Sequence, residues 1–151
     1  MQTCIVPVIS YNYAAHNADR CQKTLRASIL FGLALMALGT LCFVLMPEQM
    51  IKFFSSDETV IKIGGFGFRI IGISFLPMVT SLIFPVFFQA VACSLKSSLL
   101  TLVRTVVLFV PLGFLFSGFG LKWFWYTFPV TETITSITGV VFYRRFINKK
   151  L

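Results

Sequence analysis

The sequence has few charged residues and few that support metal or thiol chemistry. Of its 151 residues, 12% are charged, five are acidic and one is a histidine. Its cysteines form no CxxC pair; they are Cys4, Cys21, Cys42 and Cys93. His16 has no Cys or His partner at metal-ligand spacing. We therefore predict neither a thiol–quinone oxidoreductase nor a metal site, and we expect no enzyme activity and no cofactor.

Apolar residues, by contrast, make up 57% of the chain, and its mean hydropathy is +0.88. A water-soluble protein of this size does not need so many to fill its core. A helix that crosses a bilayer needs about 20 mostly apolar residues. The composition predicts an all-α integral membrane protein with lipid as its main partner, and the length allows four full transmembrane helices.

The apolar segments predict where these helices lie. They are preceded by a short apolar stretch at 1–15, which reads as the end of an earlier helix. The predicted spans are 27–46, 63–93, 99–121 and 123–143, followed by a cytoplasmic tail at 144–151. Prolines inside two of these spans remove a backbone donor and allow bending, so they are candidate hinges: Pro77, Pro85 and Pro111.

The distribution of Lys and Arg predicts the orientation, because short cytoplasmic loops collect these residues. Nine fall on one side: Arg20, Lys23, Arg26, Lys96, Arg104, Arg144, Arg145, Lys149 and Lys150. The other side has Lys52, Lys62 and Lys122, while Arg69 stands apart within a span. The C-terminus is thus predicted to be cytoplasmic. This topology and anionic lipid explain the net charge of +8 without a nucleic-acid partner.

Glu132 is the strongest candidate for a functional residue. It lies nine residues beyond Trp123, which places it roughly 13 Å into the membrane. Ser136 shares its helical face, together with Thr135 and Gly139. Ionisable residues at this depth are costly and need a partner or a function. The sequence leaves two roles open for Glu132: binding a proton, a sodium ion or a cationic substrate, or an interhelical hydrogen bond that only fixes packing.

A second polar stripe follows the span 63–93 at three- and four-residue spacing. Its members are Ser74, Pro77, Ser81, Pro85 and Gln89. The stripe either lines a pathway, which makes Ser81 and Gln89 candidate binding residues, or forms a kinked packing face.

Several motifs resemble one family of transporters. The run PVISYNYAAHN at 7–17 resembles the P-x-x-S-Y-N-Y-G-A-x-N stretch that ends the eighth helix of bacterial multidrug and toxic compound extrusion (MATE) transporters. Further pieces follow in the family's order: Lys23-Thr24-Leu25, the segment 43–54, Phe87-Phe88-Gln89-Ala90, Arg104, and Trp123 with Phe128-Pro129.

The resemblance implies a twelve-helix fold in two lobes that exchanges H⁺ or Na⁺ for small lipophilic or cationic compounds in the bacterial inner (plasma) membrane. This chain would supply most of the C-terminal lobe, and we expect it to be inactive without the missing N-terminal half. One branch of the family has a sodium-coordinating acid in helix ten, which has no counterpart between Ile63 and Cys93. Glu132 matches a place in helix twelve where the family often has an acid.

Two other functions remain open at this point. A self-contained four-helix multidrug exporter that works as a dimer would have this size and helix number, although such proteins carry their essential Glu in the first helix. A membrane scaffold protein without transport activity would also fit the composition. The match at 7–17 argues against both.

Overall fold

The computed structural model describes residues 2–150, and this part of the chain consists of helices and short connections without a strand. The elements are α1 (Gln2–Ala14), α2 (Ala18–Leu45), α3 (Pro47–Lys52), α4 (Glu58–Ala90), α5 (Ser94–Leu102), the π-helical η1 (Val103–Phe109), α6 (Val110–Ser117), α7 (Leu121–Phe124) and α8 (Thr127–Lys150). The predicted all-α fold is therefore confirmed.

The observed helix bounds differ from the predicted ones at most ends; α4, for example, is Glu58–Ala90 where the span 63–93 was predicted, and α8 begins at Thr127 where 123 was predicted. The predicted span 27–46 is part of a longer helix, because the polar residues before it continue α2 back to Ala18. The predicted span 99–121 begins earlier, at Ser94, and α6 ends at Ser117 before the turn at Gly120, whose φ is +107°. The predicted tail 144–151 is no separate segment, since α8 continues to Lys150.

Three helices between residues 2 and 150 are long and apolar enough to cross a membrane: Ala18–Leu45, Glu58–Ala90 and the continuous stretch Ser94–Ser117. The predicted fourth span corresponds to α8, which is long but too polar to meet the same criterion. Its polarity comes from a run of hydroxyl residues and Glu132 in its first half and from Arg144 and Arg145 near its end.

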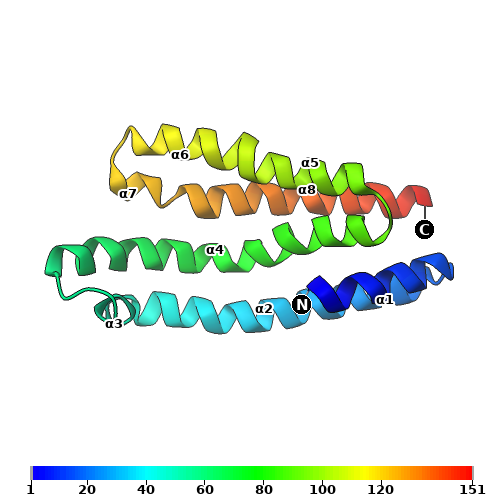
Figure 1. Cartoon of the computed structure of the whole chain (residues 1–151), viewed down its shortest axis with the longest axis horizontal. Coiled ribbons are helices and arrows are strands. Elements are labelled where there is room, and N and C mark those ends of the chain that lie inside the picture. Colours follow the sequence, from blue (N-terminus) through cyan, green and yellow to red (C-terminus); the bar gives the residue numbers. More distant parts are fainter. Residues whose placement is uncertain (1, 151) are drawn as a thin grey trace.

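The long helices lie roughly parallel, with α4 between α2 on one side and α8 on the other (Figure 1). The stretch α5–η1–α6 runs beside α8 (Figure 1). The core cluster is concentrated where α1, α2, α4, α5 and α8 meet; its most buried members are Ile9, Cys21, Phe87, Phe88, Leu100 and Phe146. This packing ties the two ends of the chain to α4.

Glycines allow close approach at both faces of α4. A Cβ at Gly72 would lie 2.8 Å from the Cβ of Phe43 on α2. A Cβ at Gly139 of α8 would lie 2.6 Å from the ring of Phe84 on α4. Small residues at such contacts are the usual means by which membrane helices pack, because lipid gives them no hydrophobic drive to associate.

Basic residues gather at one end of the bundle, where α1, α4 and α8 end and α2 and α5 begin (Figure 1). At this end the ammonium group of Lys96 lies 5.4 Å from the ring centroid of Phe88 and 4.9 Å from that of Phe146. Arg104 does not belong to this group. It lies about ten residues, or roughly 15 Å, into the helical stretch that starts at Ser94.

Candidate functional site

Glu132 lies on the face of α8 that packs against α4, and only 7% of its surface is exposed. Its neighbours on the same stripe, Thr135 and Gly139, are also buried against other helices. The predicted stripe therefore faces a helix partner. A charge in this position must be compensated, because burying an unpaired carboxylate is very costly.

Arg104 of η1 compensates this charge. Its Nη2 donates to Oε1 of Glu132 at 2.6 Å, and its Nε lies 3.0 and 3.2 Å from Oε1 and Oε2. Ser81 of α4 donates its hydroxyl to Oε2. A carboxylate has about four lone-pair sites. In this conformation three donors, the Nε–H and Nη2–H of Arg104 and the hydroxyl of Ser81, engage both oxygens of Glu132 and leave little of its acceptor capacity free.

A π-helical segment carries Arg104 to this place. Helix-interior proline lacks an N–H and its ring clashes with the carbonyl four residues back, which for Pro111 is the carbonyl of Val107. Val107 lies inside η1, where the wider π turn replaces regular α-helix and ends two residues before Pro111. Such π segments are rare and occur often at functional sites.

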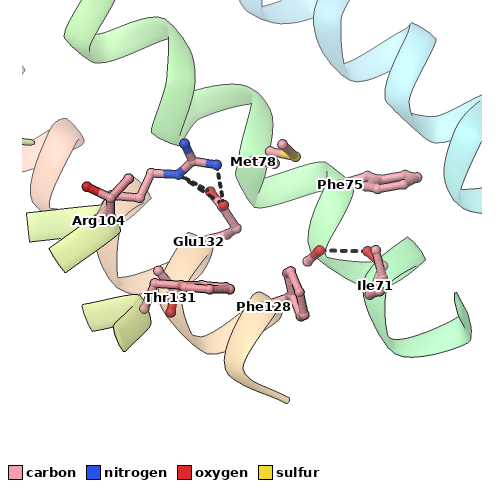
Figure 2. Close-up of a pocket in the computed structure, with 10 residues that line it drawn as sticks. Ile71, Phe75, Met78, Arg104, Phe128, Thr131 and Glu132 are labelled. Carbon is pink, nitrogen blue, oxygen red and sulfur yellow. Dashed lines mark hydrogen bonds and ion pairs between the residues drawn. The ribbon is translucent and has the colours of Figure 1, made fainter. Parts of the chain in front are cut away.

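A cavity of about 350 Å³ opens beside the ion pair. We call it the Glu132 cavity; it is lined by Ile71, Ser74, Phe75, Met78, Arg104, Thr105, Phe109, Phe128, Thr131 and Glu132. Figure 2 shows Arg104 reaching Glu132, with Phe75 and Met78 on the α4 side of the cavity and Phe128 and Thr131 on the α8 side. Its walls are thus mainly apolar and aromatic, with charge concentrated in one pair.

Thr131 also lines this cavity and carries a buried hydroxyl. Thr131 is 1% exposed, and its Oγ1 has no hydrogen-bond partner within the part of the chain that the structure describes. Nearby Ser74, in contrast, donates to the carbonyl of Ile71 at 2.6 Å. An unpaired buried hydroxyl is uncommon and indicates a place where a ligand, water or a rearranged side chain makes a hydrogen bond.

The other predicted binding residues have different positions. Ser136 hydrogen-bonds to Thr80 at 2.6 Å, one helical turn beyond Glu132, so it joins α8 to α4 but does not line the cavity. Gln89 is exposed near the end of α4, beyond both Pro77 and Pro85, and does not line the cavity; its pathway role stays a prediction. At this end of α4 the predicted polar stripe no longer faces α8, because residues spaced mostly four apart shift gradually around a helix that has 3.6 residues per turn.

The candidate hinges are all inside helical stretches. Pro77 and Pro85 lie within α4, which continues as one helix and bends toward its C-terminal end (Figure 1). Pro111 is the second residue of α6, which directly follows η1. The positions agree with bending at proline, while hinge motion itself stays a prediction.

Sequence reasoning missed Arg104 as a site residue because it counted this arginine with the basic end. The available signal was weak, because Arg104 lies only five residues inside the predicted span 99–121. With the helix beginning at Ser94, the side chain lies deep enough to need a partner in the bundle. Glu132 was the matching acid on a different predicted helix. Periodicity within one helix, however, does not say which helices are neighbours.

The MatE family model matches residues 1–115. The chain therefore belongs to the MatE family. This match confirms the resemblance seen in the sequence and covers the helices that form the α4 and Arg104 parts of the site.

Solved MATE structures have the same fold. A crystal structure of MATE in complex with MaL6 matches with a TM-score of 0.90 and 18% identity, over 97% of this chain and 34% of that one. An inward-facing multidrug resistance MATE family transporter of the MOP superfamily matches with a TM-score of 0.88 and 17% identity, over 97% of this chain and 35% of that one. An outward-facing transporter of the same family matches with a TM-score of 0.80 and 20% identity, over 97% of this chain and 34% of that one.

The chain thus spans about a third of the length of the solved transporters that it matches. The search of curated proteins found no match. The family and the apolar helices make this a multi-pass membrane protein with the fold of part of a MATE transporter.

Proposed function

We propose that this chain forms part of a secondary active multidrug antiporter, which exports xenobiotic or cationic compounds in exchange for H⁺ or Na⁺. The observation that carries the proposal is the Glu132 cavity, an apolar and aromatic chamber with one carboxylate in its wall. Such a chamber suits a lipophilic cation, because aromatic faces and a carboxylate both attract positive charge. Membership of the MatE family supports this function over the dimeric small exporter and the scaffold.

In this proposal Glu132 binds the cationic substrate or the coupling ion, and Ser81 holds its carboxylate in place. Ser136 has an indirect role, because its bond to Thr80 fixes α8 against α4 one turn away. The bends at Pro77 and Pro85 and the π segment before Pro111 give the cavity walls places to move during alternating access. Gln89 lies outside the Glu132 cavity, and a binding role for it stays a prediction.

The proposal also includes a partner and a location. Alternating access needs two halves that rock around a central site. The chain therefore works with an N-terminal lobe, and by itself it exports nothing. The basic end of the bundle, with the C-terminus, faces the cytoplasm of a bacterium, and the helices lie in its inner (plasma) membrane.

The test is efflux of a fluorescent lipophilic cation from cells that make this chain together with an N-terminal lobe taken from a full-length family member. We expect export from the pair, none from the chain alone, and a loss of export in Glu132→Gln. Glu48→Gln is the matched control, because Glu48 is an exposed acid on α3 outside the cavity. Full export by Glu132→Gln would refute the assigned site, and export by the chain alone would refute the two-lobe mechanism.

A further inference from the structure

We propose that Arg104 is a built-in competitor for the cation site: its guanidinium occupies Glu132 when the cavity is empty, and a cationic ligand binds Glu132 only by displacing it. This inference rests on the proposed function and adds how the site is controlled. It begins from the engaged acceptors of Glu132, since an arriving cation meets a carboxylate already bound by two N–H groups of Arg104, one of them shared between both oxygens, and by the hydroxyl of Ser81.

Access to the pair favours displacement of Arg104 over movement of Glu132. The side chain of Glu132 is 9% exposed, whereas that of Arg104 is 21% exposed, and both line the same cavity. Glu132 also belongs to a regular helix packed against α4. Arg104 stands on the π segment, whose longer hydrogen-bonded turn can return to α-helical register and rotate the residue away.

A displaced guanidinium needs new hydrogen-bond acceptors, because leaving a buried charge unpaired would cost more than the ligand contributes. Thr131 offers one in the same cavity, with a buried hydroxyl oxygen that has no partner among the described residues. In this proposal the Arg104 guanidinium and the cationic ligand compete for the Glu132 carboxylate. Thr131 accepts a hydrogen bond from Arg104 when the ligand displaces it.

Competition has a direct consequence for charge. With Arg104 in place the site is neutral, so it neither holds a cation tightly nor leaves a bare carboxylate in the membrane. A cationic ligand replaces the guanidinium as the partner of Glu132, so the carboxylate stays paired, while the displaced Arg104 leaves the cavity with one net positive charge. The free protein is thus protected from the energetic cost of an empty acidic site.

The experiment is equilibrium binding of ethidium to the purified 151-residue chain in lipid nanodiscs, followed by fluorescence anisotropy. Arg104→Gln removes the competing charge, so we expect its Kd to fall at least about tenfold, the equivalent of about 1.4 kcal/mol. Arg104→Lys keeps the charge but loses the forked geometry, so its Kd should fall by less. Arg69→Gln is the matched control, an exposed arginine on α4 outside the cavity, and should bind as the wild type does.

The variants separate the possible failures. Loss of binding in Glu132→Gln, together with an Arg104→Gln Kd equal to or above that of the wild type, would overturn the competition while leaving the cation site intact. Unchanged binding in Glu132→Gln would instead overturn the proposed function and the competition with it. If Arg104→Gln does not fold, Arg104→Lys decides the question, because competition requires tighter binding in that variant as well.

Discussion

The two faces of α4 are built differently. Toward α2 the contact is mostly apolar: Phe43 stacks on Phe68 and meets Phe75 edge to face, both at 4.9 Å between ring centroids, and Thr40 donates one hydrogen bond to the carbonyl of Gly72. Toward α8 the contact contains the ion pair, the Ser81 hydroxyl and the Thr80–Ser136 bond. The cavity lies on the polar side.

This difference indicates that the two faces of α4 have different roles, one in holding the bundle together and one in ligand binding. Dense apolar packing has one arrangement and resists change, because a core loses contacts when any part of it moves. A polar interface can exchange partners, since each donor and acceptor accepts a substitute of similar chemistry. We infer that the α2 side of α4 is the fixed side of the bundle and the α8 side is the part that responds to ligand.

The largest expected effect comes from breaking the polar side at its ion pair. Arg104→Met alone should lower the free energy of unfolding by about 3–5 kcal/mol, because it leaves the Glu132 carboxylate buried without its partner. The double variant Arg104→Met with Glu132→Leu should recover most of this loss, since apolar side chains replace both charges. Unfolding in mixed micelles of rising SDS content, followed by tryptophan fluorescence, measures both. A double variant no more stable than the single one would contradict the assignment.

The next largest effect is expected from a substitution on the fixed side of the bundle, where α4 packs against α2. Gly72→Ala would place its Cβ 2.8 Å from Phe43 and 3.6 Å from the carbonyl oxygen of Thr40, so the helices must separate. Overpacking costs about 1–3 kcal/mol, and the helix propensity of Ala returns about 0.5–1 kcal/mol. We expect a net loss of about 1 kcal/mol in the same unfolding measurement.

Gly39→Ala is the control for this substitution, since its Cβ would make ordinary contacts of 3.4 and 3.6 Å with the Phe75 ring. It should be neutral or slightly stabilising. Equal losses in the two variants would show that the α2–α4 contact adapts as readily as the polar side.

The smallest effect is expected from removing one interhelical hydrogen bond made by a hydroxyl group on each face of α4. Ser136→Ala removes the bond to Thr80 at 2.6 Å, and Thr40→Val removes the bond to the Gly72 carbonyl at 2.9 Å. Interhelical hydrogen bonds in membrane proteins average about 0.6 kcal/mol, so both should lower the free energy of unfolding by about that amount. If the two faces differ as proposed, only Ser136→Ala should also alter ethidium binding, by shifting α8 against α4. A change in binding in Thr40→Val would argue against a fixed α2 side.

The sequence predicted the helical membrane fold because its signals are local. Charge-free apolar runs of about 20 residues, such as 27–46, are readable without knowing any neighbour. Helix ends were less accurate for the same reason: the polar start of α2 and the basic end of α8 continue as helix, and no apolar signal marks them. Glu132 was found because an acid at mid-membrane depth is conspicuous in one helix alone.

The partners of Glu132 were harder to predict from the sequence than Glu132 itself. Ser81 was named for its spacing along α4, and that spacing also suggested Gln89, which is exposed. Both residues satisfy the one-dimensional pattern, and only the packing of α8 against the first of them separates the two. Arg104 was placed at the basic end, since its depth became clear only when α5 proved to begin at Ser94.

Sequence alone thus determined that the chain lies in a membrane, that it resembles the MATE family, and that Glu132 needs a partner or a function. The tertiary structure decided which partner it has. Arg104 and Glu132 are 28 residues apart on different helices, and their meeting depends on the π segment that Pro111 follows and on the fit of α8 into α4. Pairing between helices is set by which surfaces are complementary in three dimensions, and no periodicity along a single chain segment contains that information.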